Sequence, residues 1–189
     1  MKKQYILALV VSFLAAACEQ PVPRAASAEG FFDVSAYIQN QIDYLQAEQP
    51  MLLKSVQTGD NPVETIETGD TDWEEELAIF TEADLKRPSL RDYYIRKEER
   101  LPNGNLAVRY NKMEDAEAPI EYLYLELNPD KTLQHLEAMF LDENILFFSK
   151  RKASLSIDQG SGNISSYKIE GVQKLILGDT LQYAVHANL

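Results

Sequence analysis

The feature that most constrains the fold is a change in hydrophobic periodicity near Tyr93. Before this residue, apolar side chains recur every three or four positions; after it, they alternate with polar ones almost to the end of the chain. Alternation with period two is the pattern of β-strands, and Gly-, Asn- and Asp-containing turns interrupt it repeatedly. Short connections favour an antiparallel meander. The pattern predicts about seven strands, over 93–100, 105–110, 120–127, 132–141, 145–157, 164–177 and 180–188.

The strongest hairpin signal in this region is Asn103-Gly104. It predicts a type I′ turn, because that turn needs positive φ at both central positions.

Several of the predicted strands carry apolar side chains on both faces. In 120–127, the leucines point one way, whereas Ile120, Tyr122 and Tyr124 point the other. A sheet with one solvated face alternates more cleanly, so a second layer is expected to cover it. We therefore predict an α+β fold, with helices packed on a curved antiparallel sheet that is open or partly closed into a barrel.

The first half of the chain predicts two helices and a hairpin. Helical spacing runs over 33–48, with Asp33 as the N-cap, and a second helix starts at Asp72 and stops at Pro88. Lys86 and Arg87 are expected near the C-terminal end of that second helix. Two strand-like stretches, 51–58 and 63–68, flank a Gly-Asp-Asn turn and predict a hairpin that packs on the meander.

The N-terminus has the layout of a signal for export. Two lysines precede an apolar run over 5–17, which is shorter than the roughly 20 residues that cross a bilayer, and a small-residue site ends in Cys18. Cys18 is the single cysteine of the chain. This arrangement resembles the lipobox of bacterial lipoproteins, in which the cysteine is lipidated and becomes the mature N-terminus. Here Leu14 lies one position earlier than the leucine of that family, and an ordinary secretory cut before Cys18 is the alternative.

The resemblance implies a chain in three parts. Residues 1–17 are the signal peptide, residues 18–30 are the lipidated Cys18 and a flexible tether, and residues 31–189 are a single globular domain. The resemblance also implies attachment to the cell envelope through acyl chains such as palmitate. Glu19 after the cysteine favours the outer membrane over the inner one. The helix–hairpin–helix–meander layout, with Asp-Trp-Glu-Glu-Glu-Leu at 72–77, also resembles small uncharacterised envelope lipoproteins of bacteria.

Net charge restricts the partners. The full chain has 18 basic and 30 acidic residues, and loss of Lys2 and Lys3 with the signal leaves a net charge of −14. Such a surface repels phosphate backbones and anionic headgroups, so no nucleic acid partner is expected. The expected partners are the membrane through N-terminal acyl chains, an envelope protein and a hydrophobic ligand.

The sequence offers no catalytic constellation, and we predict no catalytic residue, metal site or cofactor. The acidic run from Asp70 to Glu76 begins like an EF-hand loop, but it lacks the glycine and the closing glutamate of that loop. His135 and His186 have no second ligand at metal-binding spacing, although His135 and Glu137 share one strand face.

Two further groups of residues have alternative interpretations. Lys150-Arg151-Lys152 is the one basic concentration, and strand alternation splits it between two faces, which suits a solvated or edge-protecting strand. The aromatic strand residues suit core packing or the lining of a ligand cavity. Those that would line a cavity are Tyr122, Tyr124, Phe147 and Phe148.

Three functions follow as hypotheses. We expect a lipid-anchored envelope protein with a non-catalytic binding or accessory role. The alternative is a carrier or chaperone for a hydrophobic or lipid ligand, and a cell-surface hydrolase ranks third. A cavity lined by the aromatic residues would support the carrier, whereas a filled interior would count against it.

Overall fold

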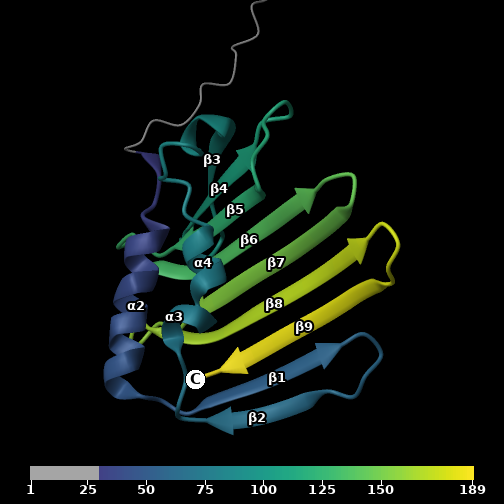
Figure 1. The fold of residues 1–189 in the computed structure, drawn as a ribbon. Helices are drawn as coiled ribbons and strands as arrows, with labels where there is room; N and C mark the ends of the chain where they lie inside the picture. The colour runs from purple at the N-terminus through teal and green to yellow at the C-terminus, as the bar shows by residue number, and fades with distance from the viewer. Residues whose placement is uncertain (1–29) are drawn as a thin grey trace, which may run out of the picture.

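One antiparallel sheet of nine strands organises the chain, and its helices lie on one face, at one end of the sheet (Figure 1). The computed structural model describes residues 30–189, so the predictions for the signal peptide, for Cys18 and for the tether up to residue 29 lie outside the described residues. The strands are β1 (Leu52–Thr58), β2 (Glu64–Thr68), β3 (Tyr94–Arg100), β4 (Leu106–Lys112), β5 (Ile120–Leu127), β6 (Leu133–Glu143), β7 (Phe147–Ile157), β8 (Ile164–Leu175) and β9 (Thr180–Asn188). The helices are α2 (Val34–Glu48), α3 (Trp73–Glu76) and α4 (Ala78–Glu82), with a 3₁₀ turn, η2, over Arg91–Tyr93.

The strand order is β2-β1-β9-β8-β7-β6-β5-β4-β3. The α+β class, the meander and the hairpin are confirmed, but the hairpin does not pack on the sheet as a separate piece. Instead β1 pairs antiparallel with β9, from Leu53 opposite Asn188 to Thr58 opposite Tyr183. The sheet therefore has nine strands rather than about seven, because β1 satisfies the backbone groups that β9 would otherwise expose at an edge.

The sheet is open. Its two edge strands, β2 and β3, lie at opposite ends of the strand order and do not pair with each other. The alternative of a partly closed barrel is therefore wrong.

The second predicted helix is interrupted and shorter than expected. Leu77 leaves helical geometry, with φ −99° and ψ 5°, so α3 and α4 are two short helices rather than one. Helix α4 ends at Glu82, and Lys86 and Arg87 lie beyond it, so their expected place in a last helical turn is wrong. The prediction that Trp73, Leu77 and Phe80 share a buried face is confirmed. All three side chains are buried, and their packing holds both short helices against the sheet.

Two local details of the meander differ from expectation. The β3–β4 turn has positive φ at Gly104 but not at Asn103, and Gly104 donates its N–H to the carbonyl of Leu101. Pro102 suits the first central position of a type I turn followed by a left-handed glycine, so the type I′ prediction is wrong. In β5 a bulge after Ile120 turns that residue to the same buried face as Leu123.

Helix α2 packs on the sheet through the stripe that the sequence predicted: Val34, Ile38, Ile42 and Leu45 are all buried. Gln41 lies on the same side and is buried too. Its Oε1 accepts the backbone N–H of Ile164 at 2.9 Å, which holds the helix to the start of β8. The core cluster begins at Phe31 and ends at Ala187, so a chain that starts at residue 19 contains all of it.

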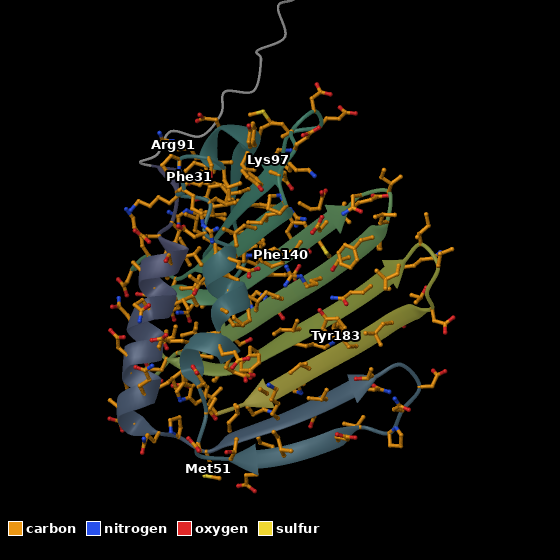
Figure 2. All side chains as sticks on the ribbon, viewed as in Figure 1. Phe31, Met51, Arg91, Lys97, Phe140 and Tyr183 are labelled. Atoms are coloured by element: carbon orange, nitrogen blue, oxygen red, sulfur yellow. The ribbon has the colours of Figure 1, made fainter. Side chains whose placement is uncertain are left out.

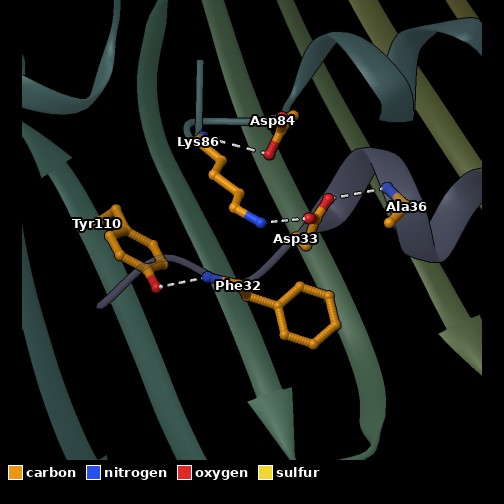
Figure 3. Close-up of polar contacts among 6 residues, drawn as sticks. All are labelled: Phe32, Asp33, Ala36, Asp84, Lys86 and Tyr110. Atoms are coloured by element: carbon orange, nitrogen blue, oxygen red, sulfur yellow. Dashed lines mark hydrogen bonds and ion pairs between the residues drawn. The ribbon is translucent and has the colours of Figure 1, made fainter. Parts of the chain in front are cut away.

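The entry to α2 is held by polar contacts (Figure 3). Asp33 caps the helix by accepting the N–H of Ala36 at 3.0 Å, and its other carboxylate oxygen accepts from Lys86 Nζ at 2.5 Å. The loop that carries Lys86 is held in turn by Asp84, whose carboxylate accepts the backbone N–H of Lys86 at 3.2 Å. Burial raises the pKa of Asp84, whereas the hydrogen bonds from Lys86 and Ala36 lower the pKa of Asp33.

We expect Asp33→Ala to lower the free energy of unfolding by about 1 kcal/mol at neutral pH, because the helix loses its cap. The pKa of Asp33 is lowered from its ordinary 3.8, so its contribution is complete above that value and is lost as pH falls through the lower folded-state pKa. Urea unfolding near neutral pH and near pH 3 measures the loss of free energy of unfolding and its dependence on pH. Asp33→Asn, which keeps a cap but loses the ion pair, is expected to lie between wild type and Asp33→Ala. An equal cost at both pH values would contradict this account.

Candidate functional site

The helices cover only one end of the sheet, and the long strands β6 to β9 extend beyond them (Figure 1). The side chain of Tyr183 lies on this uncovered part (Figure 2). A cleft of about 410 Å³ lies where the uncovered part meets α3, and we call it the α3 cleft. It is lined by Leu52, Lys54, Ile66, Thr68, Asp70, Thr71, Asp72, Glu75, Glu76, Ile169 and Val185.

The cleft has an apolar floor contributed by four different strands. Leu52, Ile66, Ile169 and Val185 come from β1, β2, β8 and β9 respectively. Pairing of β1 with both β2 and β9 brings these strands side by side. The floor therefore exists only because the hairpin joins the main sheet.

The wall of the cleft is the first turn of α3 and the segment that leads to it. Asp72 caps the helix, because its Oδ1 accepts the N–H groups of Glu74 and Glu75, both at 3.1 Å. The crowding of acids in this turn is favourable for the helix itself, since carboxylates stabilise the positive end of the helix dipole. The break at Leu77 ends the helix directly after Glu76, whose carboxylate lies over the floor of the cleft.

Glu76 is held by two donors from different strands. Lys54 Nζ lies 2.7 Å from Oε1 and 2.8 Å from Oε2, and Tyr167 donates its hydroxyl to Oε1. Burial, reinforced by the neighbouring carboxylate, raises the pKa of Tyr167 far above its usual range. The hydroxyl therefore stays protonated and acts as a donor at neutral pH. Both oxygens of the Glu76 carboxylate therefore accept hydrogen bonds from side chains of the protein itself.

The charge around the cleft is strongly unbalanced. Four carboxylates line it, those of Asp70, Asp72, Glu75 and Glu76, against the single positive charge of Lys54. Within residues 30–189, Thr71 Oγ1 is the one buried side-chain oxygen or nitrogen that has no hydrogen-bond partner. The cleft thus combines an apolar floor, a net negative lining and one unused hydroxyl group.

A second group of one Tyr, one Glu and one Lys, like that of Tyr167, Glu76 and Lys54, lies on the opposite, helix-free face of the sheet. Tyr122 donates to Glu137 at 2.6 Å, and Lys152 Nζ lies 2.9 Å from the other oxygen of the same carboxylate. Burial, with help from Glu137, raises the pKa of Tyr122 to about 12. Burial alone would raise the pKa of Glu137, but the bonds from Lys152 and Tyr122 lower it. Arg109 stacks over the Tyr122 ring at 4.2 Å.

The predicted cavity-lining aromatic residues do not meet in one place. Tyr122 and Tyr124 lie on the helix-free face, whereas Phe147 and Phe148 lie at the far end of β7. None of the four lines the α3 cleft. The cleft residues that sequence reasoning missed, such as Ile169, are ordinary alternating strand positions, and no local signal marks them.

The two histidines lie on strands, as expected. His135 shares the helix-free face with Glu137, and its ring lies 6.3 Å from that of Tyr124. His186 is exposed on β9. Among the described residues, no group of three or more His, Cys, Asp and Glu side chains is placed to hold a metal ion.

The basic triplet splits between the faces, as predicted. Lys152 faces the helix-free side, whereas Arg151 stacks on Phe140 at 5.2 Å and lies 3.4 Å from Glu82 of α4. Strand β7 lies in the interior of the sheet, so the edge-protecting interpretation is wrong.

No protein-family model, curated protein or solved structure matches this chain. From residue 30 onward, the helices are all too short or too polar to cross a membrane.

The two Tyr–Glu–Lys groups provide a matched test of the cleft. We expect Tyr167→Phe to lower the free energy of unfolding by about 2 kcal/mol, because a largely buried carboxylate loses a donor. Tyr122→Phe removes the same hydroxyl from a more exposed group and is expected to cost under about 1 kcal/mol. Urea unfolding followed by Trp73 fluorescence measures both variants. Equal losses would show that Glu76 is no more dependent on its donors than Glu137.

Proposed function

We propose that this protein is a lipid-anchored component of a bacterial cell envelope that binds, without chemical conversion, an apolar group carrying a positive charge. The observation that carries the proposal is the α3 cleft, in which an apolar floor lies beneath a net negative lining. Apolar surface favours burial of a hydrocarbon group, and the surplus of carboxylates favours a cation beside it. A basic, apolar segment of an envelope protein has this chemistry, as does a small alkylammonium compound.

The chemistry of the cleft supports a non-catalytic role. Its most buried carboxylate, that of Glu76, is held by Lys54 and Tyr167. A general acid or base must be free to exchange a proton with the substrate, and its pKa works best near the operating pH. Tyr167 fits neither requirement, because burial keeps its hydroxyl protonated.

The packing between helices and sheet favours a binding role over a carrier. Large side chains fill the described interior, among them Trp73, Phe80, Tyr94, Tyr110 and Tyr167, each almost fully buried. Sites for small apolar ligands usually bury most of the ligand surface, which an open cleft at the edge of a filled core does less well. A partner segment that lies across the cleft needs no such enclosure.

A pair of probes of equal length tests the proposal. We expect hexylammonium, but not hexanoate, to shift the amide resonances of α3 when either is titrated into the chain from residue 19. Neutralising two lining charges, with Asp70→Asn and Glu75→Gln together, is expected to weaken hexylammonium binding about fivefold. The matched control, Glu114→Gln with Asp115→Asn, removes two charges from the exposed loop between β4 and β5. Equal binding of both probes, or an equal effect of the control, would refute the proposal.

The anchor has its own test. In a bacterial host that processes lipoproteins, we expect the wild-type chain to incorporate labelled palmitate and to sediment with membranes. Cys18→Ser is expected to lose the label, because the sulfur that carries the lipid is absent. Mass spectrometry of the mature N-terminus shows whether the signal was removed. Labelling that persists in Cys18→Ser would contradict the anchoring proposal.

A further inference from the structure

Two neighbouring hairpin turns present bare aliphatic side chains to solvent. The β6–β7 turn contains Ile145 and Leu146, and the β8–β9 turn contains Ile176 and Leu177. Their exposed fractions are 89%, 63%, 62% and 98%, respectively. The two turns lie side by side, because the N–H of Ile176 donates to the carbonyl of Leu146 at 3.0 Å. We call these four residues the apolar tip.

Folding does not explain the apolar tip. Turns are normally built from Gly, Asn, Asp, Ser and Pro, which supply the required backbone conformations and are well solvated. Four aliphatic side chains gain nothing in such a place, since they contribute no burial to the core. Exposed apolar groups that cluster in this way usually mark an interaction surface.

We propose that the apolar tip inserts into the interfacial region of a lipid bilayer. The two turns project from the same ends of the strands, on the side of the sheet away from the helices (Figure 1). The hollow between the two turns, lined in part by Ile145, Leu146 and Ile176, measures only about 130 Å³, which is smaller than the sites that usually hold a small ligand. The high exposure of the four side chains suits a fluid apolar phase. Burial of such side chains among acyl chains is favourable by the same transfer free energy that drives core packing.

The length of the chain outside the described residues suits a membrane as the occupant, a step that rests on the proposed anchoring through Cys18. Gly30 is held by Tyr110 of β4, whose hydroxyl donates to its carbonyl at 2.8 Å. Two strand spacings and about six residues of β6 separate Tyr110 from the tip, or about 25 Å. The segment from Cys18 to residue 29 reaches about 40 Å when extended. The lipid anchor and the tip can therefore lie in the same membrane.

The charges beside the tip predict which membrane it prefers. Asp142, Glu143 and Asp179 flank the two turns and outnumber Lys174 beside them, and the mature chain carries a net charge of −14. Insertion must therefore be driven by apolar contact rather than by attraction to headgroups. We expect binding to phosphatidylcholine vesicles that weakens when anionic lipid is added and recovers in high salt.

Vesicle flotation tests the proposal without the lipid anchor, because the chain from residue 19 lacks Cys18 but contains the whole core. We expect this chain to float with phosphatidylcholine vesicles. The double substitution Ile145→Asp with Leu177→Asp is expected to lower its partition coefficient at least about tenfold. The control, Met51→Asp with Leu53→Asp, changes two exposed apolar residues on another part of the surface and is expected to stay within about twofold.

Three outcomes would overturn the proposal. The first is a wild-type chain that does not bind vesicles, and the second is a tip variant that binds as well as wild type. The third is a chain that forms concentration-dependent dimers, abolished in the tip variant, without binding lipid; the tip would then contact a second copy. Circular dichroism confirms that each variant is folded. Since no acyl chain is present, failure here leaves palmitate labelling at Cys18 unaffected, so the two proposals fail separately.

Discussion

Strands β1 and β9 pair along almost the whole length of β1, and this pairing joins the first strand of the described chain to the last. Without it, β9 would be an edge strand and the hairpin would have no partner beyond itself, a marginal structure in water. The pairing also brings Lys54 of β1 over the face that carries Tyr167 of β8, with Glu76 between them. The floor of the α3 cleft and the ion pair in its wall are both consequences of this one contact.

The sequence predicts what is local and misses what depends on distant pairing. Strand alternation and turn residues are properties of a few neighbouring positions, so the bounds of β5 and β9 agree closely with expectation. Pairing between β1 and β9 joins segments more than 120 residues apart, and no pattern within either strand specifies its neighbour. The α3 cleft is not predictable from the sequence for the same reason, because its floor depends on the pairing of four strands. The acidic run around Trp73 is evident in the sequence, whereas the pairing of the strands beneath it is not.

The two Tyr–Glu–Lys groups show how burial changes the role of the same side chains. On the helix-free face, Glu137 is 23% exposed and its partner Lys152 is 40% exposed, and the group serves as a cross-strand contact. Beneath α3, Glu76 is only 16% exposed, so its two donors are needed to offset the loss of water. The second group connects α3 to β1 and β8, and loss of either donor would leave a carboxylate partly buried and short of partners. Position in the fold, rather than residue type, decides which group matters for the cleft.

An open sheet has two free edges, and the placement of charge determines which surfaces are available for contact. Strand β3 forms one edge and carries charged residues at five consecutive positions, 96–100. Strand β2 forms the other edge, is only five residues long, and carries Glu64 and Glu67. Short and charged edges discourage pairing with other chains. Backbone pairing at the edges is thus discouraged, whereas Ile66 in the α3 cleft and the four residues of the apolar tip keep their apolar side chains in solvent. Apolar surface that persists beside such protected edges supports the two proposed contacts, one with a partner in the cleft and one with the membrane at the tip.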